Sequence, residues 1–326
     1  MRPLEGCLVL DFSTLLPGPL ATLLLAEAGA EVITIARPGA DEMAALAQLH
    51  RGKTRLELDL KTPDDRARLQ PLLERADILV EQFRPGVMRR LGLGYDQVAA
   101  INPKIVYCSI TGYGQHGPKS GVAGHDLNYI ADTGLLSLSM GTPANPVIPP
   151  ALMADIAGGS YPAAINILLA LRERDRTGRG RHLDVSMTDN LFTLMTGSTV
   201  ITSAGPRYRL YATKDGRMLA VGALEQRFWD EFCDVVNLEP ALRDDTRDPR
   251  ATVDRLAQIV ASDTAESWAR RIAGRDCCCS IVATVSEAIR DAHFVSRGLF
   301  GPQRSGEKET LSALPLPINR AFGSGP

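Results

Sequence analysis

Short apolar segments alternate with stretches of helical periodicity over roughly the first 200 residues of the chain. Residues 7–11 predict a strand, residues 19–28 predict a helix that ends at Gly29, and residues 31–35 predict a second strand. The same pattern predicts further strands at 78–80, 105–108 and 182–186, and helices at 63–76, 95–100 and 151–173. This alternation is typical of α/β proteins with a Rossmann-like, mostly parallel sheet, in which ligands bind at the carboxyl ends of the strands.

The pattern changes after Gly205-Pro206. Two segments, 209–214 and 217–221, flank Asp215-Gly216, and this spacing predicts a β-hairpin because glycine tolerates a positive φ. Helical periodicity follows at 226–236, 252–261 and 265–273. We therefore expect a large domain over residues 1–205, completed by about 296–326, and a smaller α+β domain over residues 206–295.

The composition of the 326 residues is that of an ordinary globular protein, with 44% hydrophobic and 23% charged residues. The formal net charge of −2, scattered over the chain, argues against a nucleic-acid partner. The N-terminus lacks the charged and apolar regions of a signal peptide, and no apolar run of about 18 residues is free of charge and proline. We expect a soluble, cytoplasmic protein without a membrane partner.

The six cysteines show neither the paired spacing of a zinc site nor that of a disulfide framework, so no metal is expected. Three of them, Cys7, Cys108 and Cys233, are isolated, and the other three form the run 277–279. The segment 277–283 predicts a short buried strand, in which cysteine serves as a small hydrophobic residue rather than as a redox group.

Candidate chemistry is concentrated at His125 and Asp155, each of which stands at the start of an apolar helical segment. Imidazole titrates near neutral pH, and the environment of a helix start or of a buried site shifts a carboxyl group in either direction. The two groups therefore suit opposite acid and base roles in a proton transfer. The alternative is that both residues only cap their helices.

The first strand-to-helix turn, residues 13–19, is not the GxGxxG sequence of dinucleotide-binding proteins. Basic residues instead cluster near the predicted strand ends, at Arg37, Arg51, Lys53, Lys61, Arg84 and Arg90. Taken singly, each is an ordinary surface charge. Together, at the ligand-binding edge of a parallel sheet, they suit a polyphosphate, which arginine grips through paired hydrogen bonds.

Several motifs occur together in a fixed order: 28–33 followed by Arg37-Pro38, 51–53 with 58–61, 83–86, 111–115 and 177–180. As a set they resemble the CaiB/BaiF family, also called the family III CoA-transferases. The resemblance covers about the first 200 residues and continues more weakly from 222–225 to 297–298. Within the family, the segment Gly-His-Asp-Leu-Asn-Tyr at 124–129 is similar to the α-methylacyl-CoA racemases rather than to the formyl-CoA transferases.

This resemblance implies an acyl-CoA thioester as substrate, no cofactor beyond the CoA of that substrate, and a homodimer whose two chains interlock. It implies His125 and Asp155 as the acid–base pair, with Glu225 as a supporting acidic residue contributed by the small domain. The Asp126 N–H would face the thioester oxygen. The implied CoA-binding residues are Arg37, Leu58, Asp59, Leu60, Lys61, Gln82, Phe83, Arg84, Arg90, Gly124, Asp126, Leu127, Asn128 and Tyr129.

Three functions remain open at this stage. A racemase would move the proton on the carbon next to the thioester, and His125 favours this interpretation. A transferase would use Asp155 as a nucleophile and carry the acyl group as a mixed anhydride. A non-catalytic acyl-CoA-binding protein would need neither group. The chain departs from the family pattern in its shorter small domain and in the cysteine run at 277–279, which replaces a proline-rich strand.

Overall fold

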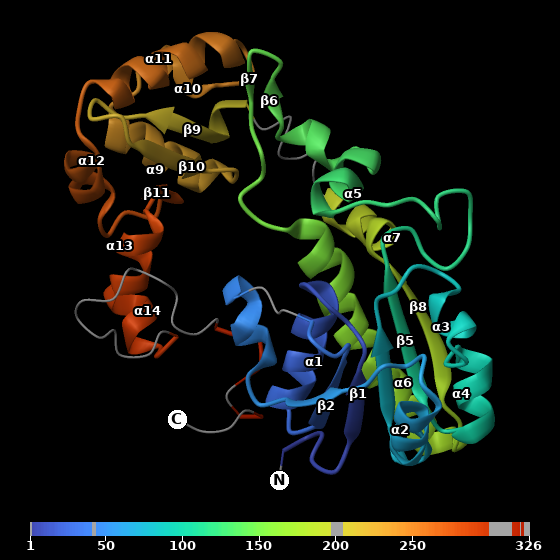
Figure 1. Ribbon diagram of the computed structural model, residues 1–326. Helices are drawn as coiled ribbons and strands as arrows, with labels where there is room; N and C mark the ends of the chain where they lie inside the picture. Colours follow the sequence, from blue (N-terminus) through green and yellow to red (C-terminus); the bar gives the residue numbers. More distant parts are fainter. Residues whose placement is uncertain (1, 41–43, 197–204, 300–314, 320, 323–326) are drawn as a thin grey trace. The chain divides into compact units, whose positions relative to one another are not determined.

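The computed structural model describes residues 2–40, 44–196, 205–299, 315–319 and 321–322 (Figure 1). The chain divides into two compact units, Met1–Met195 with Leu314–Pro326, and Thr196–Ala313. The sequence analysis placed these divisions at 205/206 and 295/296 instead. Each unit has a hydrophobic core of its own.

A six-stranded parallel sheet forms the centre of unit 1, in the order β3-β2-β1-β4-β5-β8. Its strands are β1 (Leu8–Asp11), β2 (Glu31–Ala36), β3 (Thr54–Glu57), β4 (Ile78–Glu81), β5 (Val106–Thr111) and β8 (Arg181–Ser186). From β1 the chain first builds the sheet in one direction, through β2 to β3. It then returns to the other side of β1, where β4 pairs with β1 and β5 with β4, so the strand order reverses between β1 and β4. Ligands of such sheets bind beside this reversal, at the carboxyl ends of the strands. The mixed α/β fold with a large parallel sheet, predicted from the sequence, is confirmed.

Helices cover both faces of the sheet. Alternating residues of β1 point to opposite faces: Val9 packs in one core cluster with α1 and α6, and Leu10 in the other with α2 and α4. The α-helices of unit 1 are α1 (Pro17–Glu27), α2 (Pro63–Arg75), α3 (Val87–Arg90), α4 (Tyr95–Ile101), α5 (Asp126–Asp132), α6 (Tyr161–Thr177) and α7 (Met187–Leu191). Two covered faces explain why β1, β4 and β5 are buried along their whole length.

The long helix predicted at 151–173 is two elements in the structure. A π-helix, η3 (Ala154–Ser160), runs directly into α6, which ends at Thr177 before Gly178. The combined segment Ala154–Thr177 has the length and hydropathy of a membrane span, and half of its most apolar window is buried inside unit 1. Buried core helices of folded domains have the same properties. The remaining short elements of unit 1 are η1 (Ala44–His50), η2 (Leu135–Leu138), β6 (Gly141–Thr142), β7 (Asn145–Pro146) and η4 (Phe192–Met195).

Unit 2 contains an antiparallel sheet in the order β11-β10-β9. The predicted hairpin is present, with β9 (Tyr208–Ala212) and β10 (Met218–Gly222) joined through Gly216 at φ +75°. Its helical elements are η5 (Gly205–Arg207), α9 (Gln226–Val236), α10 (Pro240–Arg243), α11 (Pro249–Ala261), α12 (Ala265–Ile272), α13 (Val285–Arg290) and α14 (Ala292–Ser296).

The cysteine run differs from the predicted buried strand. The strand β11 is limited to Cys279–Ile281, and only Cys277 of the three cysteines is buried. Cys278 is exposed and has a φ of +49°, a left-handed conformation that interrupts extended backbone. The turn is fixed by the Gly222 N–H, which donates to the Cys278 carbonyl at 2.9 Å.

Candidate active site

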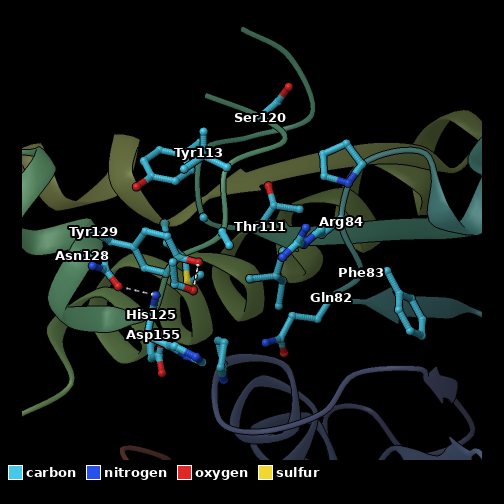
Figure 2. A pocket seen from close by; sticks show the side chains of 18 of the residues that line it. Gln82, Phe83, Arg84, Thr111, Tyr113, Ser120, His125, Asn128, Tyr129 and Asp155 are labelled. Atoms are coloured by element: carbon cyan, nitrogen blue, oxygen red, sulfur yellow. Dashed lines mark hydrogen bonds between the residues drawn. The ribbon is translucent and has the colours of Figure 1, made fainter. Parts of the chain in front are cut away.

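A cavity of about 470 Å³ opens at the carboxyl ends of β4 and β5, where the strand order predicts a ligand site. Its wall combines apolar residues from strand-to-helix turns with polar residues from α5 and η3. The lining residues are Leu15, Pro17, Gln82, Phe83, Arg84, Pro85, Ile110, Thr111, Gly112, Tyr113, Ser120, Val122, Ala123, Gly124, His125, Asn128, Tyr129, Asp155 and Met187. Figure 2 shows His125 and Asp155 close together among the residues that line this cavity.

His125 is the residue immediately before α5, with an extended backbone at φ −125° and ψ 176°. Its N–H donates to Asn128 Oδ1 at 3.0 Å, so the side chain of Asn128 fixes the start of the helix (Figure 2). The imidazole makes no capping hydrogen bond to the first turn of α5 and is exposed to the cavity. His125 thus occupies a cap position, but its ring is available to a ligand.

Tyr129 anchors the loop before His125. Its hydroxyl donates to the Gly124 carbonyl at 2.6 Å, and its ring packs against Gly112. A Cβ at Gly112 would lie 2.4 Å from that ring, so only glycine fits there. Burial and the nearby Asp155 carboxylate raise the pKa of Tyr129, and Arg84 opposes this shift. The side chains of Arg84 and Asp155 therefore both lie within electrostatic reach of Tyr129.

Asp155 is the second residue of η3 and is not a helix cap, because Met153 holds that position. π-Helical turns are rare and are often found at functional sites. The turn is held by tight packing at Gly158, where a Cβ would meet the Met187 carbonyl at 2.5 Å. Ser160 Oγ fixes it further by donating to the Asp155 carbonyl at 3.0 Å and to the Pro17 carbonyl at 2.9 Å.

The environment of Asp155 favours its protonated form. Burial raises the pKa of Asp155 to about 6, the negative charge of Asp126 acts in the same direction, and His125 opposes them. A carboxyl group with this pKa exists in both protonation states near neutral pH. Together with an accessible imidazole it can give and take protons without an added base.

The loop 82–85 supplies the opposite wall. Gln82 Oε1 accepts the Gly18 N–H at 3.1 Å, which links the loop to the first turn of α1. Beneath it, Glu81 is buried and accepts the Phe83 N–H at 2.8 Å. Burial raises the pKa of Glu81 to about 7, and the hydrogen bonds from Ser109 and Phe83 limit that rise. The loop leaves Arg84 exposed at the rim of the cavity, where it can bind an anion.

A second cavity of about 210 Å³ lies beside the first, at the ends of β1 and β2 and beside Arg55 of β3. Leu15 and Phe83 line both cavities, so the two adjoin across these side chains. Leu15 has a φ of +62°, which is a strained backbone conformation for a branched residue. Strained backbone of this kind is concentrated at binding sites. Arg37, His50 and Arg55 make the second cavity basic.

A buried ion pair fixes the turn that carries Leu15. Lys53 Nζ lies 3.2 Å from Asp11 Oδ2, and the two side chains are 1% and 0% exposed. Lys53 also donates to Thr22 Oγ1 at 2.7 Å and to the Pro19 carbonyl at 2.8 Å, both in α1. The other oxygen of Asp11 accepts the N–H of Ser13 at 3.0 Å. The pair therefore ties the end of β1 to α1 and to the turn between them.

The first cavity brings together several residues that the sequence analysis singled out: Gln82, Phe83, Arg84, Gly124, His125, Asn128, Tyr129 and Asp155. Arg37 lines the second cavity. Asp126 is buried behind the first cavity, where its carboxylate accepts the Asp155 N–H. Glu225 is exposed at the start of α9 in unit 2, and the structure does not place it relative to His125.

Other predicted ligand residues line neither cavity. Leu58 is 1% exposed in the hydrophobic core, so its side chain is not available to a ligand. Asp59 and Leu60 follow it in the turn after β3, and Lys61, Arg90 and Leu127 are exposed on the surface. The apolar residues Leu135, Leu138, Met140 and Met195 also lie outside both cavities.

Sequence reasoning missed the apolar part of the wall. Leu15, Pro17 and Met187 line the first cavity but belong to none of the motifs, and Tyr113 stands in the motif 111–115 without having been assigned to the site. Their common feature is position, since each lies in the segment that follows β1, β5 or β8. The carboxyl-end rule for parallel sheets would have identified these segments.

The fold and the site define an α/β protein with an imidazole, a carboxyl group and an arginine in one pocket at the carboxyl ends of a parallel sheet. The model of CoA-transferase family III matches residues 4–322, so the chain belongs to this family. This confirms the resemblance inferred from the sequence motifs.

Among its relatives, human alpha-methylacyl-CoA racemase is 34% identical over 97% of this chain and 86% of its own length. Mouse succinyl-CoA:glutarate CoA-transferase is 33% identical over 76% of this chain and 62% of its own length. The crystal structure of Rv3272 from M. tuberculosis superposes with a TM-score of 0.81 at 28% identity, covering 92% of this chain and 88% of that one. The relatives thus include both racemases and CoA-transferases.

Proposed function

We propose that this protein is an acyl-CoA racemase that removes and returns the α-proton of a 2-methylacyl-CoA thioester. The observation that carries the proposal is the presence of His125 and Asp155 in one cavity, with the pKa of Asp155 raised to about 6 by burial. The 34% identity to human alpha-methylacyl-CoA racemase over 97% of the chain supports it.

The reaction needs two groups that act on opposite faces of the substrate. The thioester carbonyl acidifies the neighbouring C–H bond, and loss of the proton gives a planar enolate that can be reprotonated from either face. Neutral His125 would take the proton from one epimer while protonated Asp155 returns one to the other face, and the reverse reaction exchanges these roles. The thioester itself stabilises the carbanion, so the chemistry requires no metal or redox cofactor.

The enolate oxygen needs a hydrogen-bond donor where negative charge develops. The N–H of Asp126 suits this role because it belongs to the first turn of α5, where backbone N–H groups have no partner within the helix. The Asp126 N–H follows His125 directly in the chain, so a carbonyl bound there would place its α-carbon near the imidazole.

The two adjoining cavities suit the CoA part of the substrate. Arg84 at the rim of the first cavity and Arg37 in the second would bind phosphate groups, and Phe83 lies between them. CoA is an elongated ligand, so it can extend from Asp155 past Phe83 toward Arg37. The residues Asp59, Lys61 and Arg90, which line neither cavity, would then contact CoA only at its exposed end.

The second candidate function is CoA transfer, and Asp155 is the observation that favours it. A carboxylate in the same cavity can attack the thioester carbonyl, break its C–S bond, release CoA thiolate and form an acyl-aspartyl anhydride. The mouse relative, a succinyl-CoA:glutarate CoA-transferase, is 33% identical over 76% of this chain. A transferase requires no imidazole beside the nucleophile, so the exposed His125 ring favours the racemase. A non-catalytic acyl-CoA-binding protein would have no use for either group.

A single incubation in heavy water separates these functions. We expect one epimer of a 2-methylacyl-CoA to take up deuterium at the α-carbon and to yield both epimers, read by mass spectrometry and chiral chromatography. Transfer of CoA to an added carboxylate, without deuterium uptake, would identify a transferase. Binding without either reaction would identify a carrier and contradict both enzymatic assignments.

We also propose that the protein works as an interlocked homodimer in the cytoplasm. The outer face of α6 is apolar and exposed, with Ile165 57%, Leu168 47% and Leu169 62% accessible, and an apolar cavity of about 350 Å³ adjoins it. Such a patch suits a surface that a second chain covers. The free state of all six cysteines agrees with a reducing compartment.

In the proposed dimer, Glu225 of one chain would act at the His125 and Asp155 of its partner. We expect Glu225→Ala and Asp155→Asn homodimers to be impaired, and their mixed dimer to regain up to about half of the wild-type activity per dimer. Both changes would then fall in one site and leave the other intact. A mixed dimer that forms but stays inactive, or an active monomer by light scattering, would contradict the shared site.

A further inference from the structure

The side chain of Asp126 is buried and contacts the backbone of Asp155, in addition to the role proposed for the Asp126 N–H. Its side chain is buried, with 6% of the residue exposed, although both neighbours in the chain, His125 and Leu127, are exposed. Its Oδ1 accepts the Asp155 N–H at 3.0 Å. One carboxylate therefore joins the start of α5 to the first turn of the π-helix, and the two acidic side chains are neighbours.

Burying a carboxylate is costly unless it has hydrogen-bond donors, and the Asp155 N–H is such a donor. The bond fixes where the backbone of Asp155 lies relative to His125. The π-helix η3 lacks the regular i→i−4 hydrogen bonds of an α-helix, so a bond from outside the helix helps to fix the position of Asp155. The same closeness of two carboxyl groups disfavours the state in which both are ionised.

The other elements that pack against η3 bring no comparable charge to Asp155. α1 has one charged residue, Glu27 at its far end, which pairs with Arg51 at 3.0 Å. The first charged residue of α6 is Arg172, beyond its third turn. On β8, the Asp184 carboxylate accepts the Gln115 N–H, and on α7 Asp189 is exposed. α5 contributes His125 and Asp126, which act in opposite directions on Asp155, and Arg84 stands on the opposite wall.

We propose that Asp126 is a positioning residue of this site: its buried carboxylate holds the backbone of Asp155 in place, and its charge keeps a proton on the Asp155 carboxyl group. This deepens the proposed function and rests on it, because it assumes that Asp155 exchanges protons with the substrate. The charge of Asp126 keeps the Asp155 carboxyl group protonated up to a higher pH than it would be without that neighbour.

The test is the titration of Asp155 in the Asp126→Asn variant of the full chain. Asparagine keeps an oxygen that can accept the Asp155 N–H but removes the charge. With ¹³C-labelled aspartate carboxyl groups, NMR assigns the Asp155 signal by its loss in Asp155→Asn. We expect the midpoint of Asp155 to move to lower pH in Asp126→Asn and to stay unchanged in Asp189→Asn, which removes an exposed carboxylate from a neighbouring helix.

An unchanged midpoint in Asp126→Asn would overturn the proposal. Asp126→Ser offers the same measurement with a smaller uncharged side chain. The titration needs no substrate, so its failure is distinguishable from failure of the racemase assignment, which the heavy-water experiment decides. In turnover, the pH profile of Asp126→Asn should shift to lower pH. Asp126→Ala should lose rate at every pH, because it also loses the acceptor for the Asp155 N–H.

Discussion

Asp155→Asn is expected to lower the rate of α-deuterium exchange in a 2-methylacyl-CoA by about 10²–10⁴-fold, the usual contribution of a general acid or base. The amide has nearly the same shape as the carboxyl group but cannot give and take a proton. Affinity for CoA should stay within a few fold of wild type, because Arg37 and Arg84 are unchanged. Exchange is measured by mass spectrometry, and CoA binding by calorimetry.

His125→Ala is the matched variant on the other side of the reaction. Each group is proposed to serve one face of the substrate, so exchange should fall more for one epimer than for the other, and the preferred epimer should differ between the two variants. Near wild-type exchange in Asp155→Asn would contradict the acid–base assignment. Hydroxylamine that traps an acyl hydroxamate at Asp155 during turnover would show a nucleophile instead.

The sheet was predictable from the sequence because its central strands are buried on both faces. β1, β4 and β5 are short, continuous apolar segments, which is the pattern that such burial imposes. The edge strand β3 was not predicted. Its sequence, Thr-Arg-Leu-Glu, is mostly exposed and polar. It forms a strand because its backbone pairs with β2, and its own hydrophobic pattern gives no sign of that pairing.

The π-helix was beyond the reach of periodicity. Residues 156–171 carry no charged side chain, and a count of apolar positions does not distinguish a π-helical start from a regular α-helix. What sets the turn is tertiary: Gly158 lies against the Met187 carbonyl and Ser160 bonds the Pro17 carbonyl. Both partners are distant in sequence, so no local pattern records them.

For the site, the sequence predicted the polar residues better than the cavity around them. His125, Asp155, Arg84 and Tyr129 carry chemistry and stand in recognisable motifs, and the structure brings them to one cavity. Leu58 shares a motif with basic residues, yet it is buried in the core. A motif in a linear sequence does not show which of its side chains point inward.

The second large effect concerns the ion pair beneath the site, where Lys53→Met is expected to destabilise unit 1 by about 3–5 kcal/mol. Lys53 and Asp11 are 1% and 0% exposed, so the change leaves a carboxylate buried without its counter-ion. Thr22 and Ser13 still donate to that carboxylate, but two neutral hydroxyl groups do not balance its charge. The turn that carries Leu15 should loosen together with the pair.

Both tryptophans, Trp229 and Trp268, lie in unit 2, so fluorescence does not report on the altered unit. Native-state hydrogen exchange of the amides in β1, β2 and β4 does report on unit 1, and the protection of these amides should fall roughly 10²–10⁴-fold.

The control is Arg270→Met, which breaks an exposed pair with Glu266 and should cost at most about 1 kcal/mol. Adding Asp11→Asn to Lys53→Met removes both charges and should recover part of the loss. A cost below about 1 kcal/mol for Lys53→Met alone would mean that water or a rearranged neighbour solvates Asp11, and the ion pair would then not be what fixes the Leu15 turn.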